Sequence, residues 1–133
     1  ALVEKGYRGI VIAGTGLGHV NKPLFPALKR AIDQGVHVVM TVQTLWGFAQ
    51  MYVYDTGRDL LDIGVVPLDN MLPETALMKL GWVLGHTHEH DEVMAMMRNP
   101  ISHEITEREP HNGYLILQGG LPEVDEFITD HWK

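Results

Sequence analysis

One stretch near the start of the chain narrows the folds that the chain can adopt. An apolar run, Ile10–Ala13, stops at three alternating glycines, Gly14, Gly16 and Gly18, and a helical pattern with Pro23 in its first turn follows. This order predicts a strand, a tight turn and a helix, which together open a parallel α/β unit. Because ligands bind beyond the carboxyl ends of strands in open parallel sheets, the turn is the first candidate site.

The pattern of residues 21–98 continues this alternation. Asn21 would cap a helix that ends at Gly35, and the nearly continuous apolar run 36–42 is typical of a strand covered on both faces. Residues 51–54 fit either a short strand or an extended loop. Further helices are predicted over residues 57–63, 73–84 and 91–98. Two helices should bury apolar stripes, made of Leu24, Phe25, Leu28, Ala31 and Ile32 in one and of Ala76, Leu77, Leu80, Val83 and Leu84 in the other.

The fold class that follows is a three-layer α/β sandwich with a small parallel sheet, formed by a single domain over residues 1–133. Within it, residues 109–133 read as a C-terminal extension without an assigned role, containing a strand over 114–118 and a short acidic helix over 122–129. Residues 1–6 resemble the last turn of a helix with Gly6 as its stop, and no initiating Met precedes them. We therefore expect the chain to be a fragment of a longer one.

Composition excludes several classes of function. The chain has no cysteine, which rules out disulfides, thiol catalysis and cysteine-ligated metal. Its formal net charge of −7 would repel a phosphate backbone, so we expect no direct binding of nucleic acid. No apolar run is long enough to span a membrane, and we expect no membrane partner.

The glycine turn invites a dinucleotide-binding interpretation, which fails in detail. The third glycine or alanine of that fingerprint is replaced by His19, and the second strand ends near Gln43 where an acidic residue should hold the ribose. A turn whose glycines let backbone amides point toward a small polar ligand fits better.

Three alternating histidines, His86, His88 and His90, could in principle ligate zinc. They lie between a helix end and a helix start, where alternating side chains project outward unless the loop curls around an ion. We favour a solvated loop and keep the metal site as the alternative. Taken alone, the residues contain no nucleophile with an adjacent base, so no catalytic residue is assigned within the chain.

Four segments carry a resemblance to a known family. They are residues 9–20, 38–47, 53–67 and 69–80, the last reading Asp-Asn-Met-Leu-Pro-Glu-Thr-Ala-Leu-Met-Lys-Leu. Together they resemble the C-terminal domain of the asparaginase–glutaminase superfamily, and within it the archaeal family of glutamyl-tRNA(Gln) amidotransferase D subunits. Residues 105–108, Ile-Thr-Glu-Arg, are similar to the C-terminal region of that family.

The resemblance implies a two-domain parent whose N-terminal domain carries a nucleophilic Thr, with the C-terminal domain closing the active site in a homodimer. It implies an amide substrate such as glutamine, and a cytoplasmic partner subunit that uses ATP and Mg²⁺ and holds the tRNA. No cofactor is implied for this domain, which alone would be inactive. The residues expected to line the substrate are His19, Asn21, Gln43 and Tyr54, with the backbone of the glycine turn beside them.

Two positions depart from the family pattern. Phe48 stands where we expect Arg, and Tyr52 where we expect Asn, in a loop that should face the active site. Either the ligand contacts differ here or this loop only packs. Besides the amidotransferase glutaminase, three hypotheses stay open: the same domain of a plain L-asparaginase, a module that binds an amino acid without chemistry, and a structural dimerisation domain.

Overall fold

A computed structural model describes residues 1–107 of the chain. The predicted strand and helix over 114–118 and 122–129 lie outside this described part. Three parallel strands, β1 (Gly9–Gly14), β2 (His37–Val42) and β3 (Val66–Pro67), lie in the order β1-β2-β3. Gly9 of β1 pairs with His37 of β2, and Val39 of β2 pairs with Val66 of β3. The small parallel sheet expected from the sequence is therefore confirmed.

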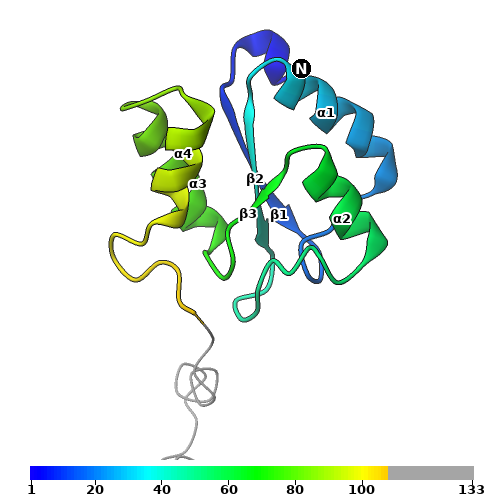
Figure 1. Ribbon diagram of the computed structural model, residues 1–133, viewed down its shortest axis with the longest axis vertical. Helices are drawn as coiled ribbons and strands as arrows, with labels where there is room; N and C mark the ends of the chain where they lie inside the picture. The colour runs from blue at the N-terminus through cyan, green and yellow to red at the C-terminus, as the bar shows by residue number, and fades with distance from the viewer. Residues whose placement is uncertain (108–133) are drawn as a thin grey trace, which may run out of the picture.

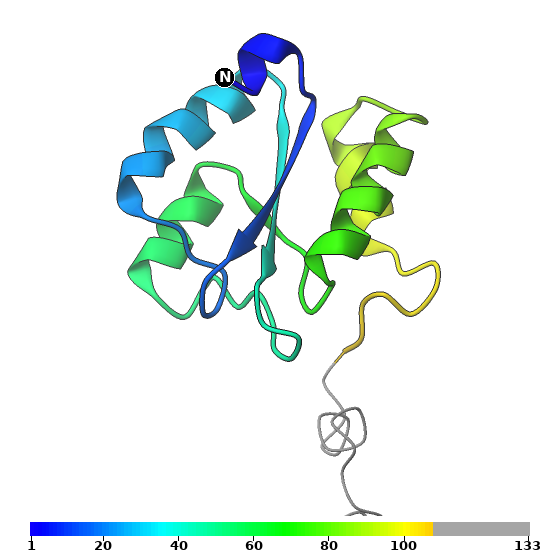
Figure 2. The same ribbon diagram turned by 180° about the vertical axis from the view of Figure 1, so that it is seen from behind.

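Helices cover both faces of the sheet (Figure 1). On one face lie the short 3-10 helix η2 (Lys22–Leu24), α1 (Phe25–Asp33) and α2 (Asp55–Asp62), and on the other α3 (Pro73–Leu84) and α4 (His90–Arg98). The reverse view in Figure 2 shows the same three layers, so the predicted three-layer sandwich is confirmed.

The central strand explains why the layers hold together. All six residues of β2 are buried, because the strand has a neighbour on each side and helices on each face. Val38, Met40 and Val42 pack into the core beneath α1 and α2, whereas Val39 packs into the core beneath α3 and α4. Alternate residues of a strand point to opposite faces, so one short apolar run supplies both cores.

The predicted helix boundaries are mostly right, with one shift that has a steric cause. The helix expected over 57–63 begins at Asp55, so Gly57 lies inside α2 instead of at its start. A Cβ at Gly57 would lie 2.0 Å from the carbonyl oxygen of Met51, which shows why this turn of helix needs glycine. Residues 51–54 form turns and bends and not a strand, which settles that alternative.

Two residues predicted to be buried are exposed. Leu24 ends η2 and is 50% exposed, and Leu77 is 61% exposed on α3. The other members of both stripes are buried or half-buried in the cores. At the N-terminus, the 3-10 helix η1 (Val3–Lys5) ends at Gly6 with φ 79°, the left-handed stop that the sequence predicts. No helix of the described part is long and apolar enough to cross a membrane.

Candidate functional site

The glycine turn follows β1 and closes on itself. The N–H of Thr15 donates to the carbonyl of His19, and the N–H groups of Gly18 and His19 donate back to the carbonyl of Thr15, at 3.0–3.1 Å. Gly16 and Gly18 have φ of 53° and 94°, and a Cβ at Gly14 would lie 2.7 Å from Met40 Sδ and 2.9 Å from the backbone nitrogen of His19. The glycines thus permit a closed turn that presents the His19 side chain.

His19 is the most suggestive polar group at this turn. Its ring contacts the ring of Tyr54 edge to face, with centroids 5.4 Å apart and planes at 65°. Its Nε2 atom is buried, and residues 1–107 provide it with no hydrogen-bond partner. A buried ring nitrogen left unpaired costs free energy, so a polar atom of a ligand would be stabilised there.

Gln43 lies beside the turn, as expected of the first residue after β2. Its backbone N–H donates to the carbonyl of Gly14 at 2.9 Å, and its side-chain Nε2 donates to the carbonyl of Ala13 at 3.0 Å. Gln43 therefore fixes the two loops to each other, and among residues 1–107 no hydrogen bond to its Oε1 is found. Asn21 is exposed at the start of η2, and its side chain makes no capping hydrogen bond.

A cavity of about 490 Å³ opens at the carboxyl end of the sheet. Phe48 and Tyr52, the two departures from the family pattern, both line it, so this loop faces a cavity instead of only packing. The opposite wall comes from the loop after β3 and from the end of the described chain. That wall consists of Asp69, Pro100, Ile105, Thr106 and Glu107.

Sequence reasoning missed this second wall, and hydrogen bonds show how it is built. The N–H of Ala49 donates to the carbonyl of Asp69 at 2.8 Å, which joins the loops after β2 and β3. Asn70 and Thr106 exchange two hydrogen bonds, of 2.6 and 3.0 Å, across 36 positions of sequence. The only local signal was Asp69, a residue type that tolerates the left-handed φ of 50° found there.

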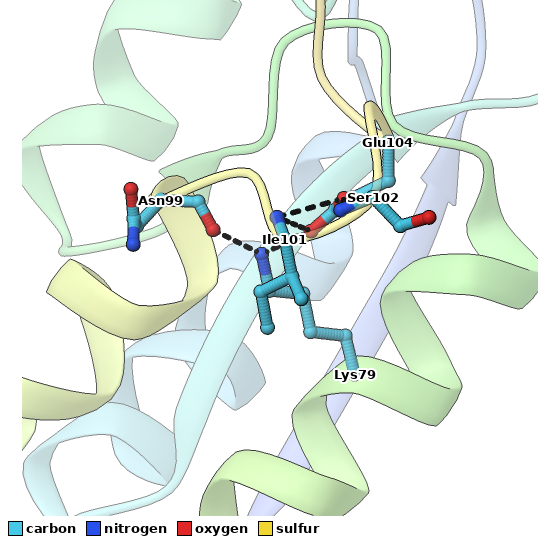
Figure 3. Close-up of polar contacts among 5 residues, drawn as sticks. All are labelled: Lys79, Asn99, Ile101, Ser102 and Glu104. Atoms are coloured by element: carbon cyan, nitrogen blue, oxygen red, sulfur yellow. Dashed lines mark hydrogen bonds and ion pairs between the residues drawn. The ribbon is translucent and has the colours of Figure 1, made fainter.

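A buried ion pair anchors the same wall (Figure 3). Lys79 of α3 donates to Glu104 Oε1 at 2.6 Å and to the carbonyl of Asn99 at 2.7 Å. Glu104 also accepts from the backbone N–H groups of Ile101 and Ser102. These contacts hold the segment after α4 against α3, and the segment then continues into the residues that line the cavity.

These contacts control the charge of Glu104. Burial disfavours the ionised carboxyl and would raise its pKa, but the Lys79 ammonium and the backbone N–H groups outweigh burial and lower the pKa to about 2. The side chains of Lys79 and Glu104 are 6% and 9% exposed, so water screens the pair little.

The three alternating histidines point to separate partners. His86 Nδ1 donates to the carbonyl of Trp82 at 2.8 Å, His88 Nε2 accepts from Arg8 at 2.7 Å, and His90 Nδ1 lies 3.3 Å from Nδ1 of His37. Over residues 1–107, no group of three or more His, Asp or Glu side chains is placed to hold a metal ion.

Hydroxyl groups near the glycine turn are also engaged. Thr15 Oγ1 donates to the carbonyl of His19 at 3.3 Å, and Thr41 Oγ1 donates to the carbonyl of Ile12 at 3.0 Å. The described residues therefore place two features at the carboxyl end of the sheet: the contact between His19 and Tyr54 at the glycine turn, and a cavity lined by the carboxylates of Asp69 and Glu107.

Comparison with known proteins agrees with the family resemblance of the sequence. A family model described as "Glutaminase/Asparaginase C-terminal domain" matches residues 1–97. The D subunit of the glutamyl-tRNA(Gln) amidotransferase of Pyrococcus furiosus is 54% identical over 115 residues, 86% of this chain and 26% of that protein. The D subunit of the Thermococcus kodakarensis amidotransferase is 55% identical over 105 residues, 79% of this chain and 24% of that protein. The chain thus spans about a quarter of these relatives.

Solved structures of two L-asparaginases share the fold. L-asparaginase I of Vibrio cholerae superposes with a TM-score of 0.68 and 35% identity, covering 77% of this chain and 31% of that one. The thermostable L-asparaginase of Thermococcus kodakarensis gives a TM-score of 0.71 and 36% identity, covering 78% of this chain and 32% of that one.

Proposed function

The chain belongs to the glutaminase/asparaginase C-terminal domain family, and we propose that it forms this domain of the glutaminase subunit of a tRNA-dependent amidotransferase. The parent enzyme would release ammonia from glutamine for the conversion of Glu-tRNA(Gln) to Gln-tRNA(Gln). The observation that carries this proposal is the identity of 54–55% to amidotransferase D subunits, against 35–36% to the L-asparaginases of known structure.

In this proposal the carboxyl end of the sheet forms one wall of an amide-binding pocket. His19 would offer its unpaired Nε2 to the α-amino or α-carboxyl end of the substrate, since that buried atom has no partner among residues 1–107. Tyr54 would hold the imidazole in place through the edge-to-face contact. The cavity behind Phe48 and Tyr52 would receive groups from outside this chain or part of the substrate.

The reacting groups would come from the parent's N-terminal domain. A Thr oxygen would attack the side-chain amide carbon, the C–N bond would break with release of ammonia, and water would then hydrolyse the acyl ester. The domain would act in a homodimer in the cytoplasm, next to a partner subunit that uses ATP and Mg²⁺. Its net charge of −7 supports a division of labour in which the partner holds the tRNA.

A chimera tests the proposal. This chain would replace the matching segment of the P. furiosus D subunit, to which it is 54% identical. We expect the chimera to release ammonia from L-glutamine, and this chain alone to release none. A folded chimera without glutaminase activity would contradict the proposed function, and turnover by this chain alone would contradict the placement of the nucleophile elsewhere.

A plain L-asparaginase is the second candidate, favoured by the two superposed structures. The two candidates differ in the substrate side chain by one methylene, which a pocket distinguishes by a modest factor. The ratio of kcat/KM for L-glutamine to that for L-asparagine, compared between the chimera and the unmodified P. furiosus D subunit, decides between them because both proteins have the same N-terminal domain. A shift of this ratio toward asparagine in the chimera would assign the domain to an asparaginase.

A further inference from the structure

A second cavity, of about 390 Å³, lies at the opposite end of the sheet from the glycine turn. It opens where the chain enters β1 and β2, and the loop before α4 contributes one side. Its polar side chains are Tyr7, Arg8, Gln34, His37 and His88, and Gly35 also lines it. The function proposed above uses none of these residues.

Basic side chains line this cavity, whereas the chain as a whole has a negative net charge. Arg8, His37 and His88 line it, and no carboxylate of residues 1–107 does, although the chain carries 17 acidic side chains. Acidic groups on the elements around it are occupied elsewhere or lie outside the lining. Glu4 pairs with the N-terminal amine and Asp33 with Lys29, Glu92 accepts from Thr87, and Glu89 and Asp91 flank His90 without reaching the cavity.

Arg8 is well placed to bind a ligand. One of its guanidinium nitrogens, Nη1, donates to His88 Nε2 at 2.7 Å, and within residues 1–107 it forms no ion pair with a carboxylate. The contact fixes Nε2 of His88 as the acceptor, so the proton of its neutral ring lies on Nδ1 and provides a further donor. The other N–H groups of Arg8 stay available in the exposed part of the side chain.

His37 forms the inner wall. It is 5% exposed, its ring stacks on His90 at a centroid distance of 5.4 Å, and the two Nδ1 atoms lie 3.3 Å apart. The ring of His37 also hydrogen-bonds the backbone of His88, so both sides of this ring have partners within the fold.

We propose that this cavity binds an oxyanion of the phosphate type, either free or as a monoester, with Arg8 as its principal ligand. The planar fork of a guanidinium matches two oxygens of such an anion. His88, in the loop before α4, provides a second donor beside the guanidinium, and His37 forms the inner wall. The cavity exceeds the volume of the anion alone, and the ring of Tyr7 would contact an attached organic group.

Calorimetric titration of this chain tests the site. Sodium sulfate is the first probe, at constant ionic strength in chloride and at pH 6, because sulfate stays a dianion over the whole working range. We expect saturable binding with a Kd of about 1 mM. Arg8→Gln should weaken it at least tenfold, whereas Arg30→Gln, an exposed control on α1 outside the lining, should leave it unchanged.

Further measurements locate the site and distinguish between its ligands. Amide NMR shifts on sulfate addition should concentrate at Tyr7, Arg8 and residues 35–37, which line the cavity. Phenyl phosphate should bind more tightly than inorganic phosphate if the organic group contacts Tyr7, and equal affinity assigns the site to the free anion. No saturation, equal binding by Arg8→Gln, or shifts centred on Lys29 of α1 would overturn the proposal, and none of these results bears on the glutaminase function.

Discussion

Lys79 and Glu104 form an ion pair of 2.6 Å between two buried side chains, and this pair joins α3 to the segment that follows α4. The same segment continues into Ile105, Thr106 and Glu107, which line the cavity at the carboxyl end of the sheet. A contact buried beneath the surface therefore shapes a wall of the proposed site.

The first prediction concerns this pair. Glu104→Gln leaves the buried ammonium of Lys79 without its countercharge, and removing one partner of a buried pair costs about 3 kcal/mol of unfolding free energy. Urea unfolding followed by circular dichroism measures the loss. Glu4→Gln, at a carboxylate 86% exposed, is the control and should change stability by less than about 0.5 kcal/mol. The double variant Lys79→Met/Glu104→Gln should recover part of the loss, and additive losses would contradict the coupling.

Acid should release the same contact. The pKa of Glu104, about 2, lies below its ordinary value of 4.5, so the folded state favours the ionised form. The stability that this group contributes is complete above pH 4.5 and is lost as the pH falls from 4.5 to 2. Unfolding free energies measured across this window should fall more steeply for the natural chain than for Glu104→Gln. Parallel curves would show that the pair does not contribute.

Two helix glycines provide a matched comparison. Gly57→Ala should destabilise the fold by about 3 kcal/mol, because its Cβ would overlap the backbone carbonyl oxygen of Met51. Gly81, in the middle of α3, has no atom of residues 1–107 within 4 Å of its Cβ position apart from its own helix backbone and chain neighbours, so Gly81→Ala should stabilise by about 0.5–1 kcal/mol. Thermal unfolding distinguishes the two, and similar effects would show that α2 does not approach Met51.

The order of strands and helices could be predicted because it depends on local patterns. The apolar run that became β2 and the proline-initiated helix α3 follow from neighbouring residues alone. Leu77 was assigned wrongly because periodicity gives the width of an apolar stripe, while the sheet decides which part of it is covered. The start of α2 was predicted two residues too late, at Gly57, because glycine is unfavourable inside a helix. Only the Met51 carbonyl beside it explains why glycine lies there.

The candidate site was predictable only in part. The adjacency of Gln43 and the glycine turn follows from parallel strands ending at one edge, and the hydrogen bond to Ala13 bears it out. The opposite wall depends on pairs 25 and 36 positions apart, Lys79 with Glu104 and Asn70 with Thr106. No local pattern marks such pairs, because their partners meet only after the helices have packed.

His37 should reveal its burial in its titration. Burial lowers its pKa below the ordinary 6.5, and the neighbouring His90 lowers it further. The neutral ring is favoured in the folded state, so its contribution to stability is present above pH 6.5 and is lost as the pH falls below that value. An NMR titration of the ring protons should give a pKa below 6.5, and His90→Ala should raise it. An unchanged pKa in His90→Ala would contradict the pairing.

His19 provides the most direct test of the proposed pocket. In the chimera, His19→Ala should lower kcat/KM for L-glutamine about 10- to 100-fold, mainly through KM, because the lost hydrogen bond to a charged substrate group is worth about 1.5–3 kcal/mol. His86→Ala makes the same substitution at an exposed histidine outside the cavity lining and should change kcat/KM less than about threefold, which makes it the matched control. Circular dichroism of both variants checks the fold. An unchanged KM in the His19→Ala chimera would show that the glycine turn does not contact the substrate. The cavity beside Phe48 and Tyr52 would then be the surface that contacts the ligand.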